Sequence, residues 1–256
     1  MAEPEIQIYQ DRESLSEAAA ELFVELAGQA AGKFTVALSG GSTPKELYRL
    51  LASDKFKNEI DWTKLFFLIG DERDAPPDSP DSNYRMASET LFGPLNISNQ
   101  QILRWETEHN DPQIITREFE RCLERFAAKD QPSAAAGGTD PLPRIDLILL
   151  GLGSDAHTAS LFPHTDALHE TERTAAANRV EKLDTWRFTL TFPVINNAAN
   201  VVFLAAGADK AEAVQTVIEG NRNTDEFPAQ SVYPKNGRLI WLLDDAAARL
   251  LTKSRS

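Results

Sequence analysis

FTVALSGGSTP, residues 34–44, joins a short apolar run to a glycine-rich turn and then to a proline. The apolar run is continuous and is ended by turn residues, which predicts a buried strand. Pro44 lies where the first turn of a helix tolerates proline, and Leu47, Leu50 and Leu51 then form an apolar stripe. A strand that leads through a tight loop into a helix is the building unit of a parallel α/β sheet.

Short apolar strands and amphipathic helices alternate along the rest of the chain in the same way. Helices are expected at 11–31 and 209–219, and strands at 5–9, 34–38, 65–69, 145–150, 187–192, 201–206 and 238–243. This order predicts one α/β domain over residues 1–256, with a mostly parallel, Rossmann-like doubly wound sheet and helices on both faces. The stretch QPSAAAGGTDPLP at 131–143 is expected to be an exposed loop within that domain.

The composition is that of a globular protein with an acidic surface. Hydrophobic residues make up 42% of the 256 residues, and 39 acidic against 26 basic side chains give a net charge of −13. Such a surface repels phosphodiester backbones and anionic lipid, so neither nucleic acid nor membrane is an expected partner. An anionic substrate would need basic side chains gathered locally.

Cysteine usage and the N-terminus bear on metal binding, disulfides and location. Cys122 is the single cysteine, so no internal disulfide can form, and its place in the amphipathic run 114–126 predicts a buried helical residue. No CxxC or His/Cys cluster suggests a metal. The N-terminus lacks a signal peptide, and no apolar run approaches the roughly 20 residues that span a bilayer. We expect a cytoplasmic protein that is a monomer or a weak homo-oligomer.

Ligands of such sheets bind at the carboxyl ends of the strands, which selects the loops 39–43, 71–83, 151–157 and 207–210. The first of these loops suits a phosphate, because glycines allow close backbone approach and the helix start offers free N–H groups. It lacks the GK[ST] ending of a Walker A loop. A tight turn with an ordinary hydroxyl cap fits the sequence equally well. The loop consists of Ser39, Gly40, Gly41, Ser42 and Thr43.

The third loop, GLGSDA at 151–156, formally matches the GxGxxA pattern of a dinucleotide site. Pro163 cuts short the helix that such a site requires, and Glu170 and Glu172 do not end a second strand as the ribose-binding acid should. A dinucleotide site is therefore the less favoured alternative.

Asp155 and His157 follow those glycines, at the end of a predicted buried strand. Histidine can both accept and donate a proton near neutral pH, and this position would face the ligand crevice. We therefore favour a functional role for His157. His109, His164 and His169 lack that setting and are interpreted as structural.

Charged residues begin the second loop and lie near the fourth. Asp71, Glu72 and Arg73 come directly after a buried strand, where they are costly unless they meet solvent or a polar ligand. Arg73 could bind a phosphate and either carboxylate could orient sugar hydroxyls, although an ordinary charged turn fits the local sequence better. Arg187, at a predicted strand start, and Lys210, at a helix start, could add positive charge, but such isolated residues are usually solvated.

Together these loops resemble the 6-phosphogluconolactonase family, which shares ancestry and fold with glucosamine-6-phosphate deaminases. The resemblance extends over residues 5–251. Its motifs are LSGGSTP at 38–44, GDER at 70–73, SN at 82–83, GLGSDAHTASLFP at 151–163, LTFPVINNA at 190–198 and PAQSV at 228–232. Their occurrence in one order is far more specific than any single motif.

The resemblance implies hydrolysis of 6-phospho-D-glucono-1,5-lactone to 6-phospho-D-gluconate, the second step of the oxidative pentose phosphate pathway, without a cofactor. It implies that His157 transfers the proton and that Asp155 assists it. The implied substrate- and phosphate-binding residues are Ser39, Gly40, Gly41, Ser42, Thr43, Asp71, Glu72, Arg73, Asn83, Arg187 and Lys210.

Two positions separate the alternatives within this resemblance. Deaminases carry a catalytic glutamate five residues after the histidine, where this chain has Phe162. A deaminase- or isomerase-like enzyme is thus disfavoured, as is a non-catalytic sugar-phosphate-binding module, because no basic helix-turn-helix segment accompanies the site. Lactonases usually have glycine where this chain has Ala156, which would be strained at a positive φ and harmless in a helical conformation.

Overall fold

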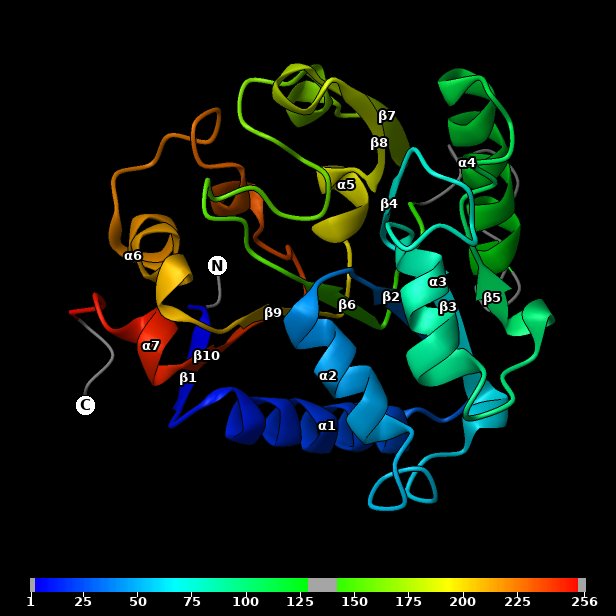
Figure 1. Ribbon diagram of the computed structural model, residues 1–256, viewed down its shortest axis with the longest axis horizontal. Coiled ribbons are helices and arrows are strands. Elements are labelled where there is room, and N and C mark those ends of the chain that lie inside the picture. The colour runs from blue at the N-terminus through cyan, green and yellow to red at the C-terminus, as the bar shows by residue number, and fades with distance from the viewer. Residues whose placement is uncertain (1–2, 129–141, 253–256) are drawn as a thin grey trace.

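The computed structural model describes residues 3–128 and 142–252, and a seven-stranded parallel sheet forms their centre (Figure 1). Its order is β1-β10-β9-β6-β2-β3-β5. The strands are β1 (Glu5–Tyr9), β2 (Phe34–Leu38), β3 (Leu65–Ile69), β5 (Ile102–Leu103), β6 (Leu147–Leu150), β9 (Asn200–Ala205) and β10 (Arg238–Asp244). All neighbouring pairs in this sheet are parallel, which confirms the predicted fold class.

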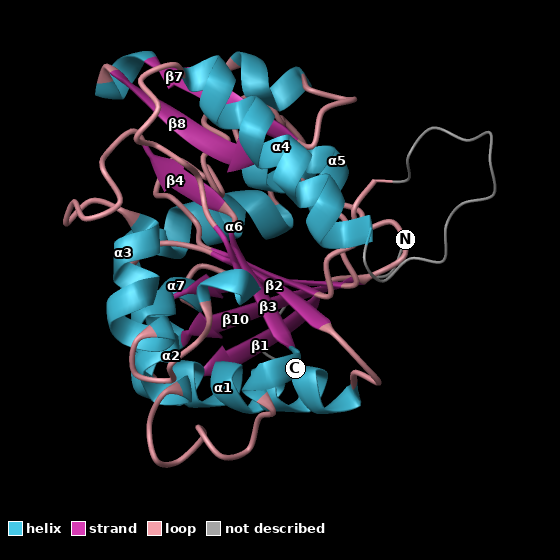
Figure 2. Cartoon of the chain, turned by 90° about the vertical axis from the view of Figure 1, so that its right-hand side faces the viewer, coloured by secondary structure: helices cyan, strands magenta, loops and turns pink. Residues whose placement is uncertain are grey.

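Helices lie on both faces of the central sheet. Figure 2 shows α1 and α2 against one face, with α4 and α5 on the opposite side. The helices are α1 (Arg12–Gln29), α2 (Ser42–Leu51), α3 (Asn83–Ala87), α4 (Pro112–Ala128), α5 (Phe192–Ile195), α6 (Ala211–Glu219) and α7 (Asp245–Ala248). Short 3₁₀ or π segments are η1 (Trp62–Lys64), η2 (Ser88–Phe92), η3 (Asn99–Gln101), η4 (Asp166–His169), η5 (Glu181–Leu183), η6 (Ala208–Lys210) and η7 (Pro228–Ser231).

The core follows from the two-sided covering of the sheet. Every residue of β2 and of β6 is buried, because strands covered on both faces have no solvent side and need continuous apolar runs. Helix α1 packs Leu15, Phe23 and Leu26 inward. Its start is fixed by Asp11, whose carboxylate accepts a hydrogen bond of 2.9 Å from the Ser14 N–H.

A second, antiparallel sheet was not predicted from the sequence. Its order is β4-β8-β7, built from Asp71–Arg73, Thr185–Leu190 and Ala175–Val180. The interpretation of 71–73 as a turn is therefore wrong. The predicted strand at 187–192 is shifted: β8 begins two residues earlier and stops at Leu190, because Pro193 favours the start of α5. Arg187 thus lies inside a strand, not at its start.

The other predicted boundaries need smaller corrections. The strand expected at 145–150 begins at Leu147, and the helix expected at 209–219 is a 3₁₀ turn followed by α6, with Lys210 as its N-cap. Cys122 lies on α4 as expected but is only partly buried.

The exposed loop predicted at 131–143 lies mostly outside the described residues. Of its residues, Leu142 and Pro143 are described, and their carbonyl oxygens accept hydrogen bonds from Asn197 Nδ2. Within 3–128 and 142–252, no helix has the length and apolar character needed to cross a membrane.

Candidate active site

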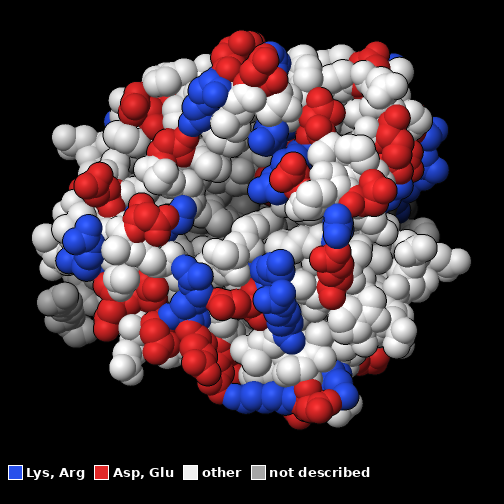
Figure 3. All heavy atoms as spheres, viewed as in Figure 1, with Lys and Arg blue, Asp and Glu red and all other residues white. Residues whose placement is uncertain are grey.

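The four loops selected from the sequence meet at the carboxyl edge of the parallel sheet around a cavity of about 470 Å³. Figure 3 shows this hollow on the face viewed in Figure 1, with several Lys and Arg side chains at its rim. Among the residues predicted for the site, those that line the cavity are Ser39, Gly40, Gly41, Ser42, Thr43, Asp71, Arg73, Asn83, Asp155, His157, Arg187 and Lys210. Glu72 is the exception.

The loop after β2 is shaped by its glycines. Gly41 has φ +111° directly before the first residue of α2, and a Cβ at Gly40 would lie 1.9 Å from Asn83 Oδ1, so neither position accommodates a side chain well. No side-chain oxygen caps α2 in the described chain, which argues against the simple capped-turn alternative. The N–H groups at this helix start are thus free for an anion.

Buried Tyr48 anchors the start of the same loop. Its hydroxyl accepts a hydrogen bond from the Ser39 N–H (3.0 Å) and donates one to the Ser39 carbonyl oxygen (2.9 Å). Ser39 Oγ is buried and has no hydrogen-bond partner among residues 3–128 and 142–252. A buried hydroxyl without a partner at a cavity wall is suited to a polar ligand.

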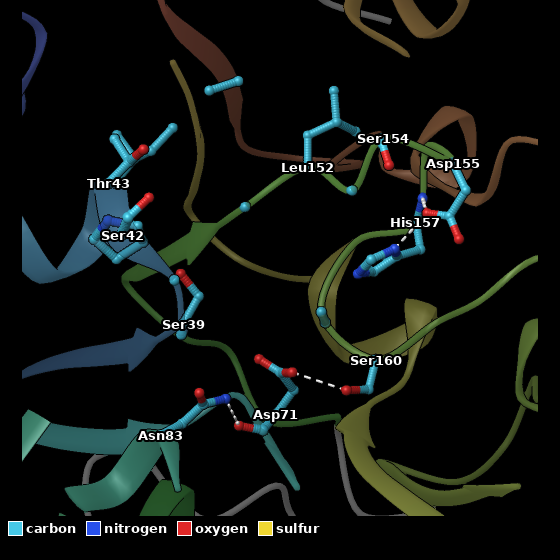
Figure 4. A pocket seen from close by; sticks show the side chains of 18 of the residues that line it. Ser39, Ser42, Thr43, Asp71, Asn83, Leu152, Ser154, Asp155, His157 and Ser160 are labelled. Atoms are coloured by element: carbon cyan, nitrogen blue, oxygen red, sulfur yellow. Dashed lines mark hydrogen bonds and ion pairs between the residues drawn. The ribbon is translucent and has the colours of Figure 1, made fainter. Parts of the chain in front are cut away.

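His157 and Asp155 form a hydrogen-bonded pair in the loop after β6. His157 Nδ1 lies 2.5 Å from Asp155 Oδ1, and the His157 N–H donates to the same oxygen over 3.2 Å. Nδ1 is therefore engaged, and Figure 4 shows the imidazole directed toward the space that Ser39 and Asp71 also face. Nε2 remains to exchange a proton with a ligand or water.

The charge of Asp155 is maintained despite partial burial. Burial alone would raise the pKa of the Asp155 carboxyl, but hydrogen bonds from His157 and Lys182 hold this pKa well below its ordinary value. Lys182 contacts the second carboxylate oxygen, Oδ2. An ionised carboxylate fixes the tautomer with hydrogen on Nδ1 and stabilises the imidazolium form. Lys182 was not predicted, because η5 lies far from Asp155 in the sequence.

Packing around the imidazole restricts its position further. Phe162 stacks on the His157 ring with centroids 4.1 Å apart and an interplanar angle of 23°. A Cβ at Gly153 would lie 2.0 Å from His157 Nδ1 and 2.6 Å from Asp155 Oδ1. Thr158 and Leu161 form a β-bridge where a dinucleotide site would require a helix, which excludes that alternative.

Ala156 adopts the left-handed conformation, with φ +59°. The sequence left open a strained conformation with positive φ and an unstrained helical one, and the strained conformation is present. The turn is closed on both sides of this residue: the Ala156 N–H donates to the Gly153 carbonyl oxygen (3.0 Å), and the Ala156 carbonyl oxygen accepts from the Ala229 N–H (3.0 Å). These bonds hold the strained backbone in place.

Asp71 is a buried carboxylate on the cavity wall. Its Oδ2 accepts a hydrogen bond from Ser160 Oγ (2.8 Å), and its carbonyl oxygen accepts one from Asn83 Nδ2 (2.7 Å). Burial raises the pKa of the Asp71 carboxyl, although Arg73 and Ser160 act in the opposite direction. Asp71 is thus part of the cavity wall and not of an exposed charged turn.

Glu72 points away from the cavity and secures the neighbouring helix. Its carboxylate accepts hydrogen bonds from the N–H groups of Arg73 (2.9 Å), Asn83 (2.7 Å) and Tyr84 (2.9 Å), and from Ser82 Oγ (3.0 Å). The expected contact of Glu72 with substrate is therefore not supported by its position. It instead holds the start of α3, and with it Asn83, against β4.

Arg73 and Arg187 are cross-strand partners in the small sheet. Like charges directly opposite each other are unfavourable. Burial lowers the pKa of the Arg187 guanidinium, and the positive charge of Arg73 lowers it further. An anion between the two guanidinium groups would relieve this repulsion.

Lys210 approaches the cavity from the loop after β9. Gly207, at φ +104°, makes the turn, and its N–H donates to both carboxylate oxygens of buried Asp244 (3.0 and 2.9 Å). Asp244 also caps α7 through the Ala247 N–H (2.7 Å). One carboxylate at the end of β10 thereby holds the turn that carries Lys210.

Comparisons with known proteins find one matching family and several similar chains. Residues 10–241 match the family described as glucosamine-6-phosphate isomerases/6-phosphogluconolactonase. The 6-phosphogluconolactonase of Nostoc sp. is 39% identical over 86% of both chains, and that of Synechocystis sp. is 40% identical over 86% of this chain and 85% of its own. The structure of 6-phosphogluconolactonase from Trypanosoma brucei has a TM-score of 0.84 at 30% identity, covering 98% of this chain and 100% of that one. A monomeric glucosamine-6-phosphate deaminase shares the fold at 19% identity, with a TM-score of 0.79 over 96% of this chain and 99% of its own.

Replacing Ala156 by glycine should stabilise the protein. The left-handed conformation costs a non-glycine residue about 1–2 kcal/mol, and the greater freedom of unfolded glycine offsets part of the relief. We expect the free energy of unfolding in urea to rise by up to about 1 kcal/mol. Ala213→Gly, at a buried helical position, is the matched control and should lower it by about 1 kcal/mol. Equal losses in both variants would show that the left-handed backbone of Ala156 is not strained.

Asp71→Asn should become more stabilising, relative to wild type, as pH rises. The pKa of Asp71 is higher in the folded than in the unfolded protein, so its contribution to stability is lost as pH rises from the unfolded toward the folded pKa. Urea unfolding at pH 4 and pH 7 should show a more favourable stability difference for Asp71→Asn at pH 7. Exposed Asp78→Asn should show no such trend. If the stability of Asp71→Asn relative to wild type were instead more favourable at pH 4, the raised pKa assigned to Asp71 would be contradicted.

Proposed function

The chain belongs to the glucosamine-6-phosphate isomerase/6-phosphogluconolactonase family, and we propose on this basis that it hydrolyses 6-phospho-D-glucono-1,5-lactone to 6-phospho-D-gluconate. Relatives that are 39% and 40% identical carry the name 6-phosphogluconolactonase, which favours the lactonase branch. The observation that carries the proposal is the Asp155–His157 pair, which opens onto the same cavity as Arg73, Arg187 and Lys210. The enzyme thus acts on a phosphorylated sugar lactone of the oxidative pentose phosphate pathway.

His157 acts as the proton-transfer residue in this proposal. A lactone is a cyclic ester, so water must attack its C1 carbonyl carbon and the ring oxygen must leave with a proton. His157 Nε2 accepts a proton from water as the new C–O bond forms. The same nitrogen returns the proton to the ring oxygen as the C1–O bond breaks. Hydrolysis changes no oxidation state, so the reaction itself requires no redox cofactor.

Direct attack by water is preferred to a covalent intermediate. A serine or threonine nucleophile would need to hydrogen-bond the base. Within the described chain, the imidazole of His157 makes its side-chain hydrogen bond to Asp155 and none to a hydroxyl group. Asp155 supports the histidine by keeping the proton on Nδ1 and by balancing the positive charge that develops on the ring.

The phosphate of the substrate is the anchor that places C1 near His157. The start of α2, with Gly41, Ser42 and Thr43, supplies N–H and hydroxyl donors. Arg73, Arg187 and Lys210 supply positive charge. Binding of this remote group fixes the reacting carbon relative to the base, which reduces the entropy cost of reaction. Because the protein carries a net charge of −13, this local cationic set is what attracts an anionic lactone.

The deaminase-like alternative is less well supported by the site. Phe162 stacks on His157 where the related deaminases would place a glutamate, so an aromatic ring occupies that position beside the imidazole. A purely sugar-phosphate-binding module would not need an oriented, ionised Asp155 beside the imidazole. A cytoplasmic location and a monomeric or weakly associating state remain predictions from the sequence.

His157→Ala should lower kcat by roughly two to four orders of magnitude while the fold persists, because general acid–base catalysis contributes about that factor. Acid release from freshly prepared 6-phosphogluconolactone, corrected for spontaneous hydrolysis, measures the effect. His109→Ala, on the surface, is the control and should leave the rate unchanged. Near-wild-type turnover of folded His157→Ala would falsify the assignment.

Arg187→Ala should mainly raise KM and change kcat little, because the lost contact to phosphate exists in both the ground and transition states. Steady-state kinetics over a range of lactone concentrations provide the measurement. Arg179→Ala, on neighbouring β7 and outside the cavity lining, should leave both constants near wild type. A large fall in kcat with unchanged KM would instead place Arg187 at the reacting carbon.

A further inference from the structure

Lys182 forms an ion pair with the side of Asp155 that faces away from His157. Its Nζ contacts Asp155 Oδ2, whereas His157 Nδ1 contacts Oδ1. The three side chains therefore form a continuous chain through one carboxylate. Lys182 belongs to η5, at the tip of the β7–β8 hairpin, whereas Asp155 and His157 follow β6 of the central sheet. This ion pair is thus a connection between the two sheets at the catalytic loop.

The Asp155 carboxylate needs such a second contact to hold one orientation. Its side chain is 31% exposed, so with one hydrogen-bond partner it could rotate toward water. Lys182 contacts Asp155 Oδ2, the carboxylate oxygen that would otherwise be available to water. Its ammonium group also lies 5.0 Å from the centre of the Phe162 ring. That ring stacks on His157. Lys182 therefore contacts both groups that restrict the imidazole.

We propose that Lys182 is a positioning residue that acts through Asp155 on His157. It keeps the carboxylate turned so that Oδ1 meets Nδ1 and Nε2 faces the cavity. This role presupposes the lactonase activity proposed above and adds a residue to its machinery. The competing role is direct binding of the substrate phosphate, since Lys182 also lines the cavity. The geometry favours the first role because the ammonium group is already paired with Asp155.

Loss of the lysine charge should also change the pH dependence of the reaction. Among the described residues, Asp155 on the same loop contacts the imidazole, Lys182 from η5 contacts Asp155, and Asp71 from β4 interacts electrostatically with His157. The cations Arg73, Arg187 and Lys210 line the same cavity. Lys182 partly balances the two carboxylates. Without it, their negative charge favours the protonated imidazole more strongly, so the acidic limb of the pH–rate profile should move to higher pH.

A double-mutant cycle separates the two roles of Lys182. We expect Lys182→Met to lower kcat about tenfold with KM within about twofold of wild type. In an Asp155→Asn background the same substitution should change kcat less than about twofold, because its route to His157 is already lost. If Lys182 instead binds the phosphate directly, Lys182→Met should raise KM. The fold-changes in the double variant should then equal the product of those in the two single variants, and this result would overturn the proposal.

Lys64→Met is the matched control for this cycle. Lys64 has the same 52% side-chain exposure as Lys182 and also lies near a carboxylate, Asp61, but is outside the cavity lining. We expect it to leave kcat, KM and the pH profile unchanged. The acidic limb should move to higher pH in Lys182→Met, and Lys182→Arg, which keeps the charge, should restore it toward wild type. An unmoved limb in Lys182→Met would contradict the proposed coupling.

Proton NMR tests the same coupling without relying on turnover. The Nδ1–H group of His157 donates to the ionised Asp155 carboxylate, and the proton of such a charge-assisted hydrogen bond should give a downfield resonance. Lys182→Met should shift or broaden this resonance, whereas Lys64→Met should not. An unchanged resonance in Lys182→Met would overturn the positioning role. Absence of lactonase activity in the wild-type protein would refute the proposed function, and the resonance would still report whether Lys182 orders the pair.

Discussion

Two buried carboxylates in β4, the strand that follows β3 directly, constrain the whole site. A buried carboxylate without partners is costly, so Asp71 and Glu72 require donors from several elements. Glu72 takes its donors from the start of α3, and Asp71 takes one from Ser160 in the segment after the catalytic loop. These demands bring α3, the small sheet and the β6 loop to one edge of the parallel sheet. The cavity is the space that this convergence leaves.

On the cationic side of the cavity, two positive charges face each other. Arg73 and Arg187 lie opposite each other in a protein that is acidic as a whole, and their mutual repulsion is a local cost in the free enzyme. In the proposed function, a bound phosphate would turn that cost into an attraction. The acidic carboxylates therefore shape the site, and the basic groups give it the positive charge that the proposed anionic substrate requires.

The parallel sheet could be predicted from the sequence because its strands are buried on both sides and read as continuous apolar runs. The small sheet could not, because Asp71–Arg73 reads as a charged turn and Ala175–Val180 lacks alternation. Family motifs identified His157 and most of the cavity wall. They gave no sign of Lys182, since its contact with Asp155 joins positions 27 residues apart and depends on how the two sheets pack. The positive φ of Ala156 likewise could not be predicted, because it depends on the folded conformation of the loop.

Gly153 has a consequence for natural variation. Every missense change at this codon adds a Cβ, and that atom would fall 2.0 Å from Nδ1 of the His157 imidazole. The collision is with His157 and Asp155, both partly exposed, and not with the apolar core between the sheet and its helices. On the proposed mechanism, alleles altered at this codon should therefore yield folded, abundant protein with impaired lactone hydrolysis, so that an immunoblot would look normal while the enzyme assay did not.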